Sequence, residues 1–201
     1  MIEIFNTEVF GLDRAVKSIK NSYIKDIDTL QSVTEREWEV ASKLGSAEIG
    51  HGHDGFLKGI LVTFDIKYPQ YWTPEFQRYS HVFIQMSTSK IHNLTKNMNK
   101  DDYKSSFNKY VDDDLIERIR SYAQNYNNAE KEDKYYWFMK TLSNLPMGYE
   151  LQMTVNTNYL QLKTIFEQRK NHKLKEDWGE FCKWCLNLPR FSELTGCKLE
   201  S

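Results

Sequence analysis

An excess of charge of one sign is missing from this sequence. Its 201 residues include 27 Lys and Arg and 28 Asp and Glu, which gives a net charge of −1. A chain without a strong overall field does not gather nucleic acid or an anionic membrane, so we expect neither as a partner. Any phosphate-binding site must therefore be built locally.

Long apolar runs and export signals are also missing. No run approaches the roughly 18 apolar residues of a membrane span, and the first residues lack a signal-peptide pattern, so we expect a soluble, cytoplasmic protein. No internal repeat and no Gly-rich phosphate-binding loop is present. With 40% hydrophobic residues, the chain is long enough for one compact domain, residues 1–201.

Cysteine is scarce, with three residues at Cys182, Cys185 and Cys197. The single C-x-x-C pair has no second pair or spaced histidines to complete a zinc site, and it lies in an expected amphipathic helix rather than at a strand-to-helix turn. We expect ordinary buried cysteines. One helical stripe, which favours a core position, contains Trp178, Phe181, Cys185 and Leu188.

Metal-binding patterns are weak in the rest of the chain. His51 and His53 lie beside Asp54, but no matching set of His, Cys or Glu residues stands out. The acidic run from Asp112 to Asp114 lies where a helix is expected to begin, and acidic residues there cap the helix and complement its dipole. We therefore predict no metal site.

The segment from His51 to His92 combines strand-like and helix-like patterns. Apolar and polar residues alternate from Leu61 to Lys67, which predicts a half-buried strand that Pro69 ends. From Tyr71 onwards, apolar residues recur at steps of three and four, which predicts a helix that carries Arg78.

Most of the remaining chain has helical periodicity. We predict a strand at residues 2–5, an exposed polar linker at residues 94–105, and helices at about residues 12–23, 34–45, 107–126 and 131–142. The first helix would carry Ala15, Ile19 and Tyr23 on one face. The apolar face of the second would consist of Trp38, Val40, Ala41 and Leu44.

Basic residues gather in a second segment, Leu145 to Leu188. Asn158 and Arg169 are three helical turns apart, so on a helix they lie on nearly one face. A basic cluster follows, made of Arg169, Lys170, His172, Lys173 and Lys175. A guanidinium suits bidentate phosphate binding, so the cluster fits an anion site, with a solvated charged surface as the alternative.

A His-containing turn, a strand and a short polar motif follow one another in the first segment. The turn HGHDGF precedes the strand, and Arg78, Tyr79, Ser80 and Thr88 come after it. This order resembles the core of the flavin-dependent thymidylate synthases, in which a helix carries Arg-His-Arg and, after seven further residues, a Ser. Arg78 keeps the first Arg, whereas Tyr79, Ser80 and Thr88 replace the other residues.

The second segment resembles the same family. Leu145 and Pro146 match its Leu-Pro turn, which a helix follows, and Asn158 and Arg169 keep the spacing of an Asn and an Arg on that helix. A second register, which uses Asn156 in place of Asn158, is also compatible with the motif.

The resemblance implies roles for the matching residues. The catalytic residues would be Arg78, Tyr79 and Thr88. The substrate phosphate would be bound by Arg78, Lys90 and Arg169. The cofactor would be bound by His53, Ser80 and Asn158. Tyr79 would donate a hydrogen bond or act as a general acid. Lys90 replaces an Arg, and this replacement keeps the positive charge but loses the planar set of guanidinium N–H donors. Two departures alter the flavin contacts, because Lys58 replaces an acidic residue and Leu160 a flavin-contacting Arg.

The resemblance also implies a fold and a reaction. The expected fold is α+β (α/β), with a central, mostly antiparallel sheet flanked by helices, in a homotetramer whose subunits share their active sites. The family reduces FAD with a nicotinamide cofactor such as NADPH, takes a one-carbon unit from methylenetetrahydrofolate, and delivers carbon and hydride to the pyrimidine of dUMP. Divergent relatives of this kind are often carried by bacteriophages.

Three functions are compatible with these patterns. The first is a flavin-dependent methyltransferase or hydroxymethyltransferase acting on a pyrimidine nucleotide. The second is a non-catalytic nucleotide binder that keeps Arg78, Lys90 and Arg169 and has lost FAD. The third is a structural or partner-binding protein on the same fold. The aromatic residues Tyr135, Tyr136, Trp137 and Phe138 suit either an oligomer interface or a core helix.

Overall fold

A four-stranded antiparallel sheet forms the centre of the chain. The computed structural model describes residues 1–22 and 32–199, and the strand order is β1-β2-β4-β3. The strands are β1 (Glu3–Phe10), β2 (Leu61–Pro69), β3 (Phe83–Ser87) and β4 (Glu150–Asn158). All neighbouring strands in this sheet run antiparallel, so the predicted α+β fold is confirmed.

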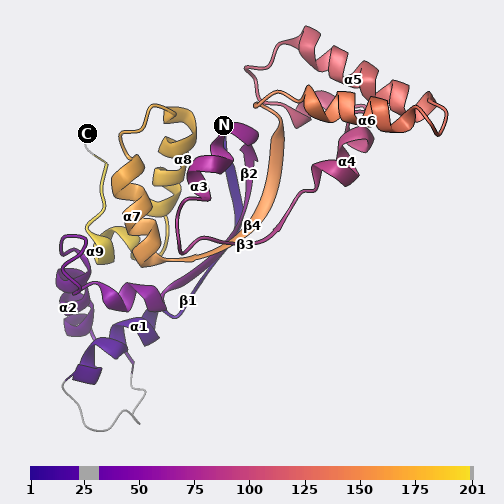
Figure 1. The fold of residues 1–201 in the computed structure, drawn as a ribbon. Coiled ribbons are helices and arrows are strands. Elements are labelled where there is room, and N and C mark those ends of the chain that lie inside the picture. The colour runs from indigo at the N-terminus through magenta and orange to yellow at the C-terminus, as the bar shows by residue number, and fades with distance from the viewer. Residues whose placement is uncertain (23–31, 200–201) are drawn as a thin grey trace.

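Helices form three groups around the sheet (Figure 1). At one end lie α1 (Leu12–Ser18), α2 (Glu35–Gly45) and α9 (Phe191–Thr195), and beside the sheet lie α3 (Thr73–Phe76), α7 (Tyr159–Arg169) and α8 (Lys175–Leu186). The arm that extends from the other end contains α4 (Lys90–Asn97), α5 (Asp113–Asn128) and α6 (Lys134–Ser143). Short 3-10 helices are η1 (Ile19–Ser22), η2 (Gly55–Gly59), η3 (Gln70–Trp72) and η4 (Tyr103–Ser106).

The predicted alternation along β2 decides which face of the sheet is covered. Val62, Phe64 and Ile66 are fully buried, because every second side chain of a strand points to the same face. The Phe64 ring lies 4.5 Å from the Trp184 ring of α8, measured between centroids. The predicted core stripe of α8 and the turn after it, Trp178, Phe181, Cys185 and Leu188, is buried as well.

The other face of the sheet combines polar and exposed apolar side chains. Thr154 Oγ1 donates to Asp65 Oδ1 at 2.6 Å, and Asn6 Nδ2 donates to Asp65 Oδ2 at 2.8 Å. These hydrogen bonds, that of Thr154 first, lower the pKa of Asp65. In the same rows of paired residues, Phe83 is 60% and Met86 75% exposed. This face therefore presents an apolar surface around a hydrogen-bonded polar centre.

The helix predicted to carry Arg78 is shorter than expected. The helical segment ends at Phe76, Arg78 lies in the following turn, and β3, a strand that was not predicted, begins at Phe83. Phe83 pairs with Asn156 of β4, so the chain must turn back toward the sheet before it reaches β3. The helix expected after Leu145 and Pro146 begins only at Tyr159, because the unpredicted strand β4 comes first. Here strand pairing overrides the local helical spacing.

The predicted exposed linker at residues 94–105 was wrong. Within this segment α4 continues to Asn97, Leu94 and Met98 are fully buried, and Tyr103 is 8% exposed. Three apolar side chains in a polar stretch are enough to fix it against the rest of the arm.

The helix predicted from residue 107 begins only at Asp113. Phe107 instead forms an isolated antiparallel bridge with Tyr149, and the two ring centroids lie 5.4 Å apart. Asp112 occupies the N-cap position without a side-chain cap bond, whereas Asp113 and Asp114 lie in the first turn, where they complement the helix dipole as predicted. The next predicted helix, residues 131–142, corresponds to α6.

The predicted helix at residues 34–45 is confirmed as α2. Thr34 and Glu37 form a capping box at its start, and hydrogen bonds and charge from Lys20 and Thr34 lower the pKa of Glu37 to about 2. Val40 is 42% exposed and was wrongly placed on the apolar face. In the first helix, α1 and η1 reach Ser22, and the predicted continuation to residue 23 lies outside the described residues.

The aromatic run of α6 divides between surface and core. Tyr135 is 74% and Tyr136 57% exposed, whereas Trp137 and Phe138 are half-buried against α5. The run is therefore not a plain core helix, and its place in an oligomer interface stays a prediction.

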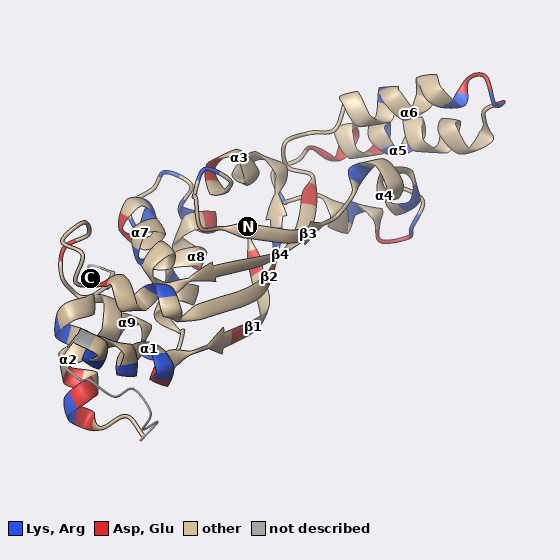
Figure 2. Cartoon of the chain, turned by 60° about the horizontal axis from the view of Figure 1, so that its bottom comes forward, with Lys and Arg blue, Asp and Glu red and all other residues tan. Residues whose placement is uncertain are grey.

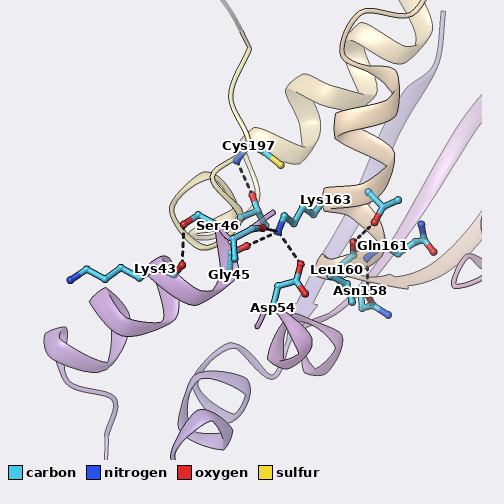
Figure 3. A network of polar contacts seen from close by, with 12 residues as sticks. Lys43, Gly45, Ser46, Asp54, Asn158, Leu160, Gln161, Lys163 and Cys197 are labelled. Atoms are coloured by element: carbon cyan, nitrogen blue, oxygen red, sulfur yellow. Dashed lines mark hydrogen bonds and ion pairs between the residues drawn. The ribbon is translucent and has the colours of Figure 1, made fainter. Parts of the chain in front are cut away.

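A buried lysine fastens α7 to the segment that precedes β2 (Figure 3). Lys163 Nζ lies 2.9 Å from Asp54 Oδ2 and donates to the carbonyl oxygens of Gly45 at 2.8 Å and Ala47 at 2.6 Å. The Lys163 side chain is 4% and that of Asp54 6% exposed. Because Asp54 directly precedes η2, this ion pair sets the position of Lys58 on η2 relative to α7.

Replacing Lys163 with Met should destabilise the fold strongly. The change leaves Asp54 buried without its cation, which costs about 3–5 kcal/mol in other buried pairs, and urea unfolding would measure it. The matched control is Lys183→Met, which breaks an exposed pair with Glu180, since Lys183 is 61% exposed; it should cost less than ~1 kcal/mol. Equal losses of stability in the two variants would contradict this role of Lys163.

Candidate functional site

A pocket of about 510 Å³ lies where α7, η2 and the turn between α3 and β3 meet. Its lining residues are Lys58, Arg78, Tyr79, Ser80, His81, Asn158, Leu160, Gln161, Thr164, Gln168 and Arg169. Three of them carry a permanent positive charge, and none is an Asp or Glu. Charged residues of both signs are spread over the chain (Figure 2), so the pocket is a local basic site in a protein of nearly zero net charge.

The turn that carries Arg78 is held against the start of α7. The backbone N–H of His81 donates to Gln161 Oε1 at 3.2 Å, and Thr157 Oγ1 donates to the His81 carbonyl at 2.8 Å. Asn158 Oδ1 accepts from the backbone N–H of Gln161 at 2.9 Å and thereby caps α7. The end of β4 and the first turn of α7 therefore fix one wall of the pocket.

Arg169 is oriented by two partners. Its Nε donates to the Tyr79 hydroxyl oxygen at 2.7 Å, and its Nη1 lies 3.2 Å from Glu75 Oε2. The guanidinium also lies 4.6 Å from the centre of the Trp178 ring, whose Nε1 donates to the same Glu75 oxygen at 2.8 Å. Glu75 therefore neutralises part of the Arg169 charge and holds the side chain in place.

Tyr79 is arranged to donate a proton rather than to accept one. Its oxygen already accepts from Arg169 Nε, which leaves its own O–H free to turn toward a ligand. Burial raises the pKa of the Tyr79 phenol, while the hydrogen bond and charge of Arg169 oppose the rise. The phenol thus stays protonated at neutral pH, as the predicted role of hydrogen-bond donor requires.

Five of the predicted site residues meet at this pocket. They are Arg78, Tyr79, Ser80, Asn158 and Arg169, which come from two segments far apart in the sequence. Of the two registers considered for the second motif, Asn158 lines the pocket. Asn156 instead accepts a hydrogen bond from Thr63 at 2.7 Å.

Three predicted site residues lie elsewhere in the chain. His53 is exposed and does not line the pocket. Thr88 hydrogen-bonds to Gln152 and lines a depression on the open sheet face, and Lys90 Nζ donates to Gln70 Oε1 at 2.7 Å. One chain therefore does not gather the whole predicted site.

Three polar residues on α7 line the pocket but were not among the predicted site residues. Gln161, Thr164 and Gln168 follow Asn158 at steps of three or four residues, the spacing that places side chains on one helical face. That spacing was the available signal. Lys58 and Leu160, identified only as departures from the family pattern, are also part of the pocket wall.

Metal and thiol chemistry find no support among the residues that the structure describes. No group of three or more His, Cys, Asp or Glu residues there is arranged to hold a metal ion. All three cysteines are buried, and burial raises the pKa of Cys182 to about 12 and that of Cys197 to about 11. Across residues 1–22 and 32–199, no helix has the length and apolarity to cross a membrane.

Comparison with known proteins relates this arrangement to one fold. No family model and no curated protein sequence matches the chain. The flavin-dependent thymidylate synthase ThyX from Helicobacter pylori, complexed with FAD and dUMP, matches at a TM-score of 0.70 and 14% identity over 96% of this chain and 97% of that one. The chain has the fold of the flavin-dependent thymidylate synthases.

Two further structures share the thymidylate synthase fold. A second structure of the Helicobacter pylori enzyme with FAD and dUMP gives a TM-score of 0.70 at 13% identity, over 97% of both chains. The UMP/dUMP methylase PolB from Streptomyces cacaoi, bound with 5-Br dUMP, gives 0.56 at 12% identity over 84% of this chain and 77% of that one. The resemblance found in the two sequence motifs is thus confirmed at the level of the fold.

Titration of Tyr79 provides a test of its environment. The Cζ resonance of Tyr79, assigned with Tyr79→Phe in carbon-13 tyrosine-labelled protein, should titrate above the ordinary value of 10. Arg169→Met should raise the midpoint further, because the cation favours phenolate, and Glu75→Gln should lower it, because the carboxylate disfavours phenolate. A midpoint below 10, or shifts of the same sign in both variants, would show that this contact is wrong.

Proposed function

We propose that the pocket binds a pyrimidine nucleoside monophosphate such as dUMP, and that the chain transfers a one-carbon unit to its base. The observation that carries this proposal is the set of three cations around a pocket without a carboxylate, next to the phenol of Tyr79. All three similar structures named above contain dUMP or 5-Br dUMP. Their shared fold supports the same class of ligand here.

Arg78 is the best-placed residue to bind the phosphate. It is exposed, lines the pocket, and forms no ion pair with any residue of the described chain. A guanidinium can give a phosphate two parallel hydrogen bonds. Arg169, held by Glu75, contributes a fixed positive charge, and the Tyr79 O–H is free to stabilise negative charge that develops on the pyrimidine ring.

The residues present fit a flavin only in part. Ser80 and Asn158 line the pocket and would contact FAD, which when bound supplies the hydride for such a reaction, with methylenetetrahydrofolate and NADPH as cosubstrates. Leu160 offers no donor at the position where the resemblance places a flavin-contacting Arg. Lys58 places a cation where the resemblance places an acid.

A shared site would explain why Thr88, Lys90 and His53 lie outside the pocket of one chain. We infer a homo-oligomer, a tetramer by resemblance, that assembles through the open sheet face. Phe83 and Met86 are exposed there, and Thr88 lines the same face, so association would bury an apolar surface and bring Thr88 to an interface.

The substitution Met86→Asp tests this assembly. Light scattering after size-exclusion chromatography should give a multiple of the 23.9 kDa chain for the unmodified protein and a smaller assembly for the variant. Val40→Asp places the same charge on an exposed apolar position of α2, in the helical group at one end of the sheet, and should leave the mass unchanged. A monomeric unmodified protein would exclude a site shared between copies.

Calorimetric titration with dUMP tests the nucleotide site. Loss of a charge-assisted hydrogen bond costs ~1.5–3 kcal/mol, so Arg78→Gln should weaken dUMP binding roughly ten- to hundredfold. Arg118→Gln removes the same charge from an exposed position on α5 and should change affinity less than about twofold. Equal affinities in the two variants, or equal binding of deoxyuridine and dUMP, would contradict a phosphate site at Arg78.

The altered flavin contacts favour a second candidate, a non-catalytic nucleotide-binding protein. Leu160 and Lys58 are the observations behind it, since both line the pocket. Titration with FAD, followed by flavin fluorescence with and without dUMP, separates the candidates. Flavin binding that responds to dUMP, together with one-carbon transfer from methylenetetrahydrofolate, supports the enzyme. Binding of dUMP without FAD supports the second candidate.

A further inference from the structure

A second concave surface lies on the other side of Arg169. It has a volume of about 470 Å³ and is formed by the end of α7, the loop to α8, and α8. We call it the basic groove, and the lining residues that matter here are Arg169, Lys170, His172, Lys175, Gly179 and Lys183. Four of these are Lys or Arg, and among the described residues that line the groove, which also include Asn171 and Leu199, none is an Asp or Glu. Arg169 lines both the nucleotide pocket and the groove, so the two are adjacent.

One face of α8 forms the floor of the groove. Lys175, Gly179 and Lys183 are spaced by four residues, which places them along a single stripe of the helix. Gly179 therefore lies one helical turn from each of the two lysines. We call the gap at Gly179 the notch, and a lysine lies one turn to either side of it.

Gly179 has no packing role within the described chain. Apart from its chain neighbours and the backbone of its own helix, a Cβ atom built at this position would meet no heavy atom of the described residues within 4 Å. A helix with glycine in its middle is less stable than the same helix with alanine. The φ angle of Gly179 does not lie in the positive range that would require glycine. The missing side chain keeps the floor of the groove open, and no side chain of residues 1–22 or 32–199 fills that space.

The charges of the groove are only partly compensated. Lys183 pairs with Glu180 at 2.7 Å, Lys170 with Glu167 at 2.8 Å, and Arg169 with Glu75 at 3.2 Å. Lys175 forms no side-chain hydrogen bond or ion pair with the residues that the structure describes. The groove therefore keeps an excess of positive charge in a chain whose net charge is −1.

We propose that the basic groove binds a small, multiply charged anion, a short chain of phosphates or of carboxylates, at a site separate from the nucleotide pocket. Several lysines on a concave surface attract a ligand with several negative charges more strongly than one with a single charge. The limited volume and the near-zero net charge favour a small anion over a nucleic acid, which needs an extended basic surface.

Calorimetric titrations of the full chain at low salt test the groove with two probes, inorganic tripolyphosphate and tetraglutamate. We expect binding of at least one probe to one site per chain, weakened by added salt. The tighter probe identifies whether phosphates or carboxylates are the natural chemistry. The double variant Lys175→Gln, Lys183→Gln should bind about tenfold more weakly, because it removes two of the exposed positive charges that attract the anion.

The matched control is the double variant Lys43→Gln, Lys96→Gln. It changes the net charge by the same amount on exposed positions of α2 and α4, and it should weaken binding less than about twofold. Equal weakening of probe binding in the two double variants would show that the effect comes from the overall charge of the protein, and it would overturn the proposal. Failure of both probes to bind the unmodified chain would overturn it as well.

A second variant tests the open floor without changing any charge. Gly179→Leu should fill the notch and weaken probe binding, whereas Gly179→Ala should raise the midpoint of urea unfolding, because alanine favours the helix. Circular dichroism confirms that each variant is folded. Unchanged probe affinity in folded Gly179→Leu would contradict binding at the floor.

The proposals for the basic groove and for the nucleotide pocket can be contradicted independently of each other. The lysine variants leave Arg78 and Tyr79 in place, so the affinity for dUMP should match that of the unmodified chain. Loss of dUMP binding in Arg78→Gln with intact tripolyphosphate or tetraglutamate binding would separate the two sites in the opposite direction.

Discussion

The pairing of β2 with β4 is the constraint on which the rest of the structure depends. Nine residue pairs join the strands, from Leu61 opposite Asn158 to Pro69 opposite Glu150. This register faces the apolar side chains of both strands toward α8, and it brings the end of β4 next to the start of β2. The Tyr159 N–H consequently donates to the Ile60 carbonyl at 3.0 Å, so α7 begins beside η2. The pocket forms where these two elements meet, and a shift of one residue in the register would turn the apolar side chains away from the core.

Electrostatics then divides the basic residues of the pocket into two kinds. Arg169 is held between Glu75 and Tyr79, and its side chain is 14% exposed. The carboxylate of Glu75 already balances part of its charge. Arg78 and Lys58 are exposed and have no ionic partner in the described chain. A paired charged side chain contributes a fixed pocket wall and a fixed electrostatic field, whereas an unpaired charged side chain can form an ion pair with a ligand. The arrangement therefore combines a rigid wall at Arg169 with adaptable cations at its edge.

Local patterns predicted those parts of the fold that depend on neighbours in the sequence. The alternation along β2, the helix at about residues 34–45 and the helical spacing from Asn158 to Arg169 each reflect interactions within a few residues. The strand β3 and the burial of Leu94 in the arm depend on partners far along the chain, and no local period reveals them. The same reason separates the site predictions. Residues on the turn and on α7 meet because β4 joins them, whereas Thr88 follows β3 and lines the open sheet face.

The departures from the thymidylate synthase pattern also make sense together. By the resemblance, Ser80 and Leu160 each replace an Arg of the family, which would remove two positive charges from the site, whereas Lys58 replaces an acid, which would change the local charge by the same amount in the opposite direction. All three positions line one pocket. The total charge that a ligand meets is thus kept, but its location has moved from the two Arg positions to η2. This unchanged total charge supports the proposal that the pocket binds a phosphate and contacts the rest of its ligand differently.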